Sequence, residues 1–145
     1  MLDHWHTHNS QSISDALTRV DTLSEAVLEF FSLWLDTNRF SATLEQAIRD
    51  WARLDNKVLA KVREEDQLRI AQIQQCYVRF NYTRDEALVR ARILYFAQIG
   101  YYAMHMEESM HDRLAMTSLY YQSFTGRKLN ARVAKTLSSR FKHST

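Results

Sequence analysis

The sequence predicts an all-α fold, a helical bundle of about six helices. The 145 residues include no proline and only two glycines, Gly100 and Gly126, although sheets and tight turns use both residue types heavily. Apolar residues recur at intervals of three and four along most of the chain, which is the spacing of one helix face. The composition, 46% apolar and 25% charged, is that of a globular protein. Helices are predicted over residues 2–20, 22–37, 43–54, 56–80, 84–108 and 112–125.

The first predicted helix, residues 2–20, carries an apolar stripe and three histidines. His4 and His8 lie four residues apart and therefore share a face, whereas His6 points away from it. Two histidines at this spacing can bind a metal ion, but no carboxylate is placed as a third ligand. We interpret this face as solvated and predict no metal site.

The second and third predicted helices have broad apolar faces. The second begins at a capping box, in which Thr22 caps the helix and Glu25 follows three residues later. It is apolar over more than half of its circumference and therefore needs partners on more than one side. The third helix, residues 43–54, has a single stripe that includes Ile48 and Trp51.

The fourth predicted helix, residues 56–80, is long, and two charged residues interrupt its apolar face. Asp66 and Arg69 lie three residues apart, and we interpret them as a partly exposed ion pair of small energetic value. A buried pair, or a polar contact for a ligand or a second subunit, is the alternative. Cys76 lies on the apolar face, which indicates a small buried hydrophobic residue rather than a nucleophile. Asn81 is expected to end this helix, because asparagine tolerates the left-handed conformation of a C-terminal cap.

The fifth predicted helix, residues 84–108, begins at a second capping box and organises the chain. Its residues 93–106 are almost all apolar, apart from Gln98, Gly100 and His105. This run is too short to span a bilayer, which takes about 20 residues. A helix that is apolar all round must be buried all round. We therefore predict that its far side, with the helix over residues 112–125, forms the interface of a symmetric homodimer. The predicted interface residues are Leu94, Tyr101, Leu119 and Tyr120.

After Gly126 the chain becomes basic. Six of the 19 basic side chains follow this glycine, and none of the 17 acidic ones does. Apolar residues four apart, from Leu129 to Phe141, predict a short amphipathic helix that docks on the body or frays. We therefore divide the chain into a helical domain, residues 1–126, and a basic amphipathic tail, residues 127–145. Contact of this tail with nucleic acid phosphates is a weaker hypothesis.

The chain contains no recognisable catalytic or cofactor motif. A single Glu-x-x-His spacing, Glu108 to His111, falls at a predicted helix boundary, whereas a di-iron bundle needs two such motifs and further glutamates. Glycine-rich phosphate loops and nucleophile motifs are lacking. The single cysteine excludes an internal disulfide, and residues 1–11 are too polar for a signal peptide. We predict a cytoplasmic protein that is not an enzyme and that has no cofactor, no metal and no membrane contact.

Residues 47–102 resemble the C-terminal half of TetR-family bacterial transcriptional regulators. The residues that carry the resemblance are AIRDWARLDNKVLAKVREEDQLRIAQIQQ, followed by TRDEALVRARILYFAQIGYY. The first segment has a short helix centred on Trp51 and then a long helix with an acid-x-x-Arg feature, Asp66 with Arg69. The second has an Ala-rich, Arg-bearing helix that leads into apolar residues and Gly100. Asn81 and Asn56 replace the glycine and proline that many relatives have at these turns.

The resemblance implies a regulatory domain that dimerises through a four-helix bundle and binds a small effector between its helices. The family reads DNA through an N-terminal helix-turn-helix, and these residues contain none. Residues 1–20 look like the linking helix that follows that reader. We therefore expect a truncated regulator, an isolated regulatory domain, or a product that naturally lacks the reader. Any DNA contact of the family kind would need a reader outside this chain.

The leading hypothesis is a dimeric domain that binds a small apolar or aromatic effector. Gln98 and His105 lie seven residues apart on one face and could orient a polar group of the ligand, or bond to other side chains. Most of the aromatic residues are expected to be core. The alternative is a stand-alone interaction module that pairs with an intact regulator and so titrates it. The predicted ligand-binding residues are Phe30, Trp34, Trp51, Tyr77, Gln98, Tyr102 and His105.

Overall fold

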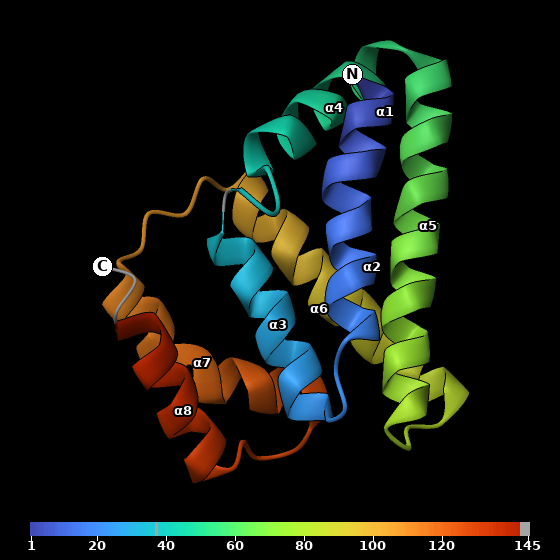
Figure 1. The fold of residues 1–145 in the computed structure, drawn as a ribbon. Coiled ribbons are helices and arrows are strands. Elements are labelled where there is room, and N and C mark those ends of the chain that lie inside the picture. Colours follow the sequence, from blue (N-terminus) through green and yellow to red (C-terminus); the bar gives the residue numbers. More distant parts are fainter. Residues whose placement is uncertain (37, 143–145) are drawn as a thin grey trace. The chain divides into compact units, whose positions relative to one another are not determined.

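The computed structural model describes residues 1–36 and 38–142, with side chains except at residues 34–35, 136–138 and 140–142. Within that part of the chain every regular element is a helix, which confirms the predicted all-α class (Figure 1). The chain divides into two compact units, Met1–Met104 and His105–Thr145. The second unit therefore holds the predicted basic tail together with the helix before it. Whether residues 1–126 and 127–145 behave as separate domains stays a prediction.

The first unit contains six α-helices and one π-helical segment among its described residues. The bounds match the predicted helices closely, except at the ends discussed below. The elements are α1 (Leu2–Trp5), η1 (His6–Ser10), α2 (Gln11–Thr18), α3 (Leu23–Leu35), α4 (Ala42–Leu54), α5 (Asn56–Arg79) and α6 (Arg84–Ala103).

The helix starts are fixed by side-chain caps. The hydroxyls of Thr22 and Thr83 accept hydrogen bonds from the backbone N–H groups of Glu25 and Glu86, which confirms the threonine caps of the two predicted capping boxes. The side chains of Ser41 and Asp55 cap α4 and α5 in the same way. Asn81 follows α5 with a φ of 74°, so the predicted left-handed end of that helix is confirmed.

The first helix contains a π turn that the apolar spacing did not indicate. Residues 2–18 form one continuous helical run, but its middle, His6–Ser10, is wound as a π-helix. A π turn rotates the following residues relative to an α-helix, and such turns occur often at functional sites. Here Asn9 and Ser10 are both buried, next to the apolar Trp5 and Ile13. These four residues form the inner face of the first helix.

Helix α6 ends at Ala103, so the predicted end at residue 108 is wrong. His105 adopts a left-handed backbone conformation with a φ of 51°, which stops the helix although the sequence stays apolar. Met104 and Met106 are exposed as a result. Ser109 then caps a new helix by accepting the N–H of Asp112.

The second unit holds two helices, α7 (Met110–Thr125) and α8 (Ala131–Lys142), which contact each other. Gly126 ends α7 with a φ of 72°, and this conformation is the reason for a glycine at that point. Helix α8 confirms that the basic segment is helical. Its apolar residues Leu137 and Phe141 lie outside the described side chains.

In the first unit α5 packs against α4 and α6, and the run α1–η1–α2 contacts α5 along its length (Figure 1). The inner face of α5 is apolar near both ends and charged in the middle. Val58 and Val62 join an apolar cluster with Trp5 and Ile48, and Ile73 lies in a second apolar region toward the other end. Between the two apolar regions lie the buried charged residues Glu65 and Arg69. We call this middle part of the unit the polar layer.

Candidate functional site

The predicted ligand pocket is only partly assembled. Phe30 and Tyr77 are both buried and line one interior cavity together with Leu94. Trp51, by contrast, is 37% exposed on α4 and is not among the residues that line this cavity. The side chain of Trp34 lies outside the described residues. Two of the predicted aromatic walls therefore meet.

The polar residues assigned to the pocket lie apart from one another. Gln98 is buried on α6 and donates a hydrogen bond of 3.3 Å to the hydroxyl of Tyr102, whose ring stacks on Phe40. Its carbonyl oxygen has no partner within the described part of the chain. His105 is exposed beyond the end of α6 and belongs to the second unit. The seven-residue spacing no longer places His105 beside Gln98, because α6 ends before His105.

The interior cavity has a volume of about 10 Å³. That is room for about one water molecule and far below the volume of a small organic ligand. Its lining is apolar apart from the thiol of Cys76 and the hydroxyl of Tyr77, and it includes Leu17 from α2 and Ile73 from α5. An effector could enter this region only if the side chains around it moved.

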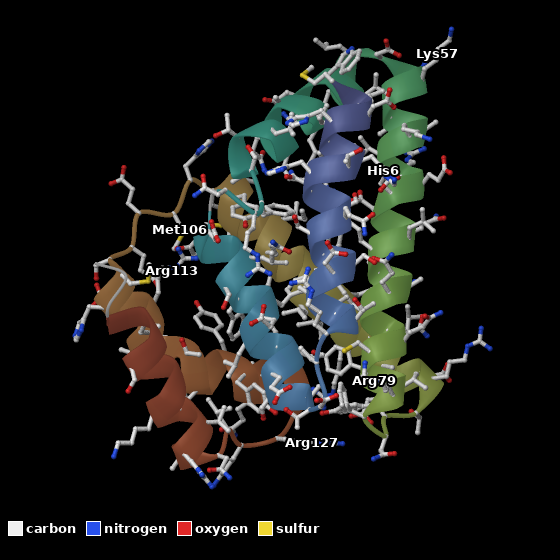
Figure 2. All side chains as sticks on the ribbon, in the orientation of Figure 1. His6, Lys57, Arg79, Met106, Arg113 and Arg127 are labelled. Atoms are coloured by element: carbon white, nitrogen blue, oxygen red, sulfur yellow. The ribbon has the colours of Figure 1, made fainter. Side chains whose placement is uncertain are left out.

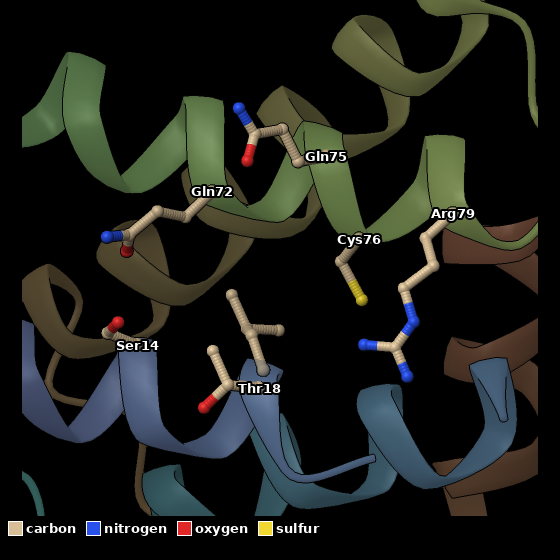
Figure 3. A pocket seen from close by; sticks show the side chains of 7 residues that line it. Ser14, Thr18, Gln72, Gln75, Cys76 and Arg79 are labelled. Carbon is tan, nitrogen blue, oxygen red and sulfur yellow. The ribbon is translucent and has the colours of Figure 1, made fainter. Parts of the chain in front are cut away.

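A larger depression lies on the other side of Leu17 and Cys76. We call it the α2–α5 groove, and its volume is about 340 Å³. Figure 3 shows Cys76 and Arg79 reaching from α5 toward the opposite wall, where Ser14 and Thr18 lie. Leu17 and Cys76 line both the groove and the interior cavity, so these two side chains separate them. The groove is lined by Ser14, Leu17, Thr18, Gln72, Gln75, Cys76 and Arg79.

Arg79 is the single charged residue in the lining of the α2–α5 groove. Its guanidinium donates a hydrogen bond to the carbonyl of Val20 and lies 5.0 Å from the centre of the Phe80 ring. Within the described part of the chain no carboxylate forms an ion pair with it. Among the described residues, the groove therefore carries one arginine without an ion-pair partner.

Cys76 is buried and chemically quiet, as predicted. Burial raises the pKa of its thiol to about 11, and the nearby charge of Arg79 offsets part of that increase. At pH 8 only on the order of one thiol in a thousand is then ionised, so nucleophilic chemistry at this sulfur is slow. Its place in the wall between groove and cavity is the more informative property.

The polar layer is the most elaborate feature of the first unit. Glu45 on α4 is fully buried, and one of its oxygens accepts hydrogen bonds from the Trp5 indole (2.5 Å), Asn9 (3.2 Å) and Arg69 (2.7 Å). Arg69, 1% exposed, also donates to Ser10. These contacts join the first helix, α4 and α5 through one buried ion pair.

A second branch runs from Ser10 to the surface. Its hydroxyl donates to Glu65, which is 4% exposed, and the other oxygen of Glu65 lies 2.7 Å from the Nδ1 of His6. His6 is more than half exposed and lies on the first helix beside α5 (Figure 2). His6 therefore does not share the face of His4 and His8, as predicted, and its ring lies against Glu65 of α5 instead.

The third branch is centred on Tyr95 of α6. Its hydroxyl donates to Asp66 at 2.5 Å and accepts from both Arg49 and Arg69 at 3.1 Å. Burial, more than the neighbouring charges, raises the pKa of Tyr95, so the phenol stays neutral. Burial alone would lower the pKa of Arg49, but its two hydrogen bonds to Asp66 and the surrounding charges outweigh it and raise that pKa.

Asp66 and Arg69 therefore do not form the exposed ion pair that the sequence suggested. Asp66 binds Arg49, whereas Arg69 binds Glu45, and the two residues meet only through the hydroxyl of Tyr95. The interpretation as a pair of small energetic value is wrong, because Arg69 is fully buried. The signal available in the sequence was Glu65 and Arg69, four residues apart on the same face as Val62 and Ile73.

Tyr95→Phe is expected to lower the free energy of unfolding by about 1–3 kcal/mol. The phenyl ring keeps the packing, but two buried guanidinium donors and one carboxylate acceptor lose their shared partner. Chemical denaturation of the variant and the unmodified chain measures the difference. Tyr120→Phe, which changes a hydroxyl on a half-exposed ring, is the matched control and should change stability by less than about 0.5 kcal/mol. Equal effects of the two substitutions would contradict the role assigned to Tyr95.

The residues predicted for a dimer interface differ in exposure. Leu94 is 2% exposed and packs within its own subunit, and Tyr101 is half-buried. Leu119 and Tyr120 are exposed on α7. The exposed apolar residues of α6 are instead Val89, Ile93 and Phe96, on the side of the helix opposite Leu94. No contact between copies is described, so the interface itself stays a prediction.

Two features of the described residues bear on contact with metal ions and with membranes. The rings of His4 and His8 stack on each other at 5.5 Å, which places them on one face as predicted. No group of three histidine, cysteine, aspartate or glutamate side chains in residues 1–36 and 38–142 could hold a metal ion. No described helix is both long enough and apolar enough to span a bilayer.

Comparison with known proteins identifies no relative. No family model, no curated protein and no solved structure matches the chain. The resemblance to TetR-family regulators therefore remains an expectation from the sequence, and the function that it implies is a proposal. The arguments that follow use the geometry of α6, the α2–α5 groove and the polar layer.

Proposed function

We propose that this chain is the regulatory domain of a TetR-like transcriptional regulator, which dimerises and binds a small effector with an apolar or aromatic body. DNA would be contacted only through a helix-turn-helix that these residues do not contain. The observation that carries the proposal is the division of α6 into two faces. The inner face, with Ala87, Ala91 and Gln98, is buried in its own unit.

The opposite side, which we call the α6 outer face, is apolar and exposed. Val89, Ile93 and Phe96 are 53%, 46% and 59% exposed, and at 100° per residue they lie within one narrow stripe. Gly100 continues this stripe, and a Cβ atom added there would meet nothing within 4 Å. Exposure of three large apolar side chains to water is unfavourable. The glycine in the same stripe allows another helix to approach closely.

A second copy of the chain is the occupant that this face fits best. A two-fold axis would pair the α6 outer face with itself, so one stripe supplies both halves of the contact. The exposed Met116, Leu119 and Tyr120 of α7 give a second apolar surface of the same kind. The proposed four-helix bundle consists of these two helices from each copy.

The sensing half of the proposal is supported by the α2–α5 groove. Effector binding between α2 and α5 would move α5, which packs on α6, and so favour one arrangement of the dimer. The second candidate is a stand-alone interaction module that pairs with an intact regulator. The small cavity of about 10 Å³ favours this candidate, because an interaction module needs no interior ligand site.

The dimer is tested by introducing a glutamate at one of two aliphatic residues that are about equally exposed, Ile93 on α6 or Leu68 on α5. Ile93→Glu places a carboxylate in the α6 outer face and is expected to give a monomer, because the charge would be desolvated on pairing. Leu68→Glu, at a position 49% exposed on α5, is the matched control and should remain dimeric. Light scattering after size exclusion measures both masses. If both variants keep the dimer mass, or if both lose it, the assignment of this face is refuted.

A further inference from the structure

We propose that the α2–α5 groove binds a small monocarboxylate with an apolar chain, and that this is the effector class. The proposal rests on the sensing function proposed above and adds the site and the chemistry of its ligand. The carboxylate would bind the guanidinium of Arg79. The apolar chain would lie against Leu17 and Cys76 and press toward the interior cavity.

The size and lining of the groove suit a small organic molecule. Its volume of about 340 Å³ lies within the range of small-molecule sites. The two walls come from different helices, with Ser14 and Thr18 on α2 and Gln72 and Gln75 on α5. Hydroxyl and amide groups on both sides can donate to an anion, and no lining residue is acidic.

The charge of the groove selects an anion. Arg79 has a planar fork of N–H donors that matches a carboxylate, and its contacts with Val20 and Phe80 hold it at one end of the groove. No described carboxylate pairs with it, so a ligand would not compete with an internal ion pair. One arginine balances a single negative charge, which favours a monocarboxylate over a phosphate monoester.

The floor of the groove selects an apolar chain. Leu17 and Cys76 are the side chains that separate it from the interior cavity, whose other walls include Phe30, Ile73 and Leu94. A flexible chain that displaced these two side chains would open an apolar channel behind them. The cavity of about 10 Å³ would grow by the volume of the inserted chain, and α2 would move relative to α5.

Cys76 provides a reporter within the proposed site. It is the single cysteine of the chain, so alkylation by neutral iodoacetamide at pH 8, although slow, modifies this one thiol in the groove wall. Octanoate is the probe, and octanamide has the same chain without the charge. Octanoate is expected to slow alkylation about tenfold at nine times its dissociation constant, because the bound groove excludes the reagent. Octanamide should bind at least tenfold more weakly, since it lacks the charge-assisted pair with Arg79.

Three variants test whether Arg79 supplies the charge. Arg79→Gln should weaken octanoate binding at least tenfold and leave octanamide binding unchanged, whereas Arg79→Lys should restore part of the affinity. Arg63→Gln, an exposed arginine on the same helix outside the groove, should bind octanoate like the unmodified chain. The comparison of octanoate with octanamide needs no variant and remains valid if Arg79→Gln fails to fold.

Failure of this proposal is distinguishable from failure of the regulatory function. Alkylation that octanoate does not slow, or that octanoate and octanamide slow equally, overturns the carboxylate site. If the same samples are dimeric and another small molecule raises their melting temperature, the regulatory function stands without this site. If octanoate protects Cys76 in a chain that is monomeric by light scattering, the groove stands and the dimeric regulatory function falls.

Discussion

Arg69→Ala is expected to lower the free energy of unfolding by about 3–5 kcal/mol, because it breaks a buried ion pair. Glu45 is fully buried, and its closest charged partner is Arg69 at 2.7 Å. Without that partner the carboxylate keeps only Arg49, 3.5 Å away, as a charged neighbour. A buried charge that is poorly paired costs far more than a missing surface contact.

Denaturation with urea measures this loss, and Arg63→Ala is the control because Arg63 is exposed on the same helix. The control should change stability by less than about 0.5 kcal/mol. Adding Glu45→Gln to Arg69→Ala should recover part of the loss, because a neutral amide costs less to bury than a carboxylate. A loss below about 1 kcal/mol for Arg69→Ala, or no recovery in the double variant, would contradict the buried pair.

Phe30→Ala is expected to lower the free energy of unfolding by about 3–5 kcal/mol and to create a binding cavity. Phe30 is fully buried and already borders the cavity of about 10 Å³. Removal of its ring would enlarge that cavity to a size that accepts a small aromatic molecule and stays dry, because most of its walls are apolar. For a chain of this size the melting temperature should fall by roughly 10 °C.

Calorimetry with and without benzene tests both parts of this prediction. Benzene should raise the melting temperature of Phe30→Ala and leave the unmodified chain unchanged, since only the variant has room for it. Leu54→Ala, at a position 90% exposed, is the control and should change stability by less than about 0.5 kcal/mol. If benzene stabilised both proteins equally, the interior of the unmodified chain would be larger than described here.

The helices and their starts could be predicted from local chemistry. Thr22 and Thr83 are each followed three residues later by a glutamate, which predicts that each threonine caps a helix. The hydrogen bonds of the two threonine hydroxyls confirm both caps. The end of α6 could not, because apolar residues continue past it and His105 takes a left-handed conformation that histidine rarely adopts. Periodicity records which residues are apolar, and it does not record where the backbone turns.

The polar layer was hidden from the sequence for a different reason. Glu45, Asp66 and Tyr95 lie on three helices, and nothing in their sequence spacing indicates that they converge. The π turn at His6–Ser10 also interrupts the α-helical period, and the apolar spacing did not indicate it. The site prediction failed in part for the same reason, since aromatic content predicted a pocket whereas packing filled most of it.

The central claim is that the α6 outer face pairs two copies of this chain, as a dimeric regulatory domain requires. Sedimentation equilibrium of the unmodified chain at roughly 10 μM tests it most directly. The predicted result is twice the 17.2 kDa mass of one chain. On dilution the dimer should dissociate reversibly into monomers. A mass of 17.2 kDa throughout, up to roughly 100 μM, would contradict the dimer and with it the proposed regulatory function.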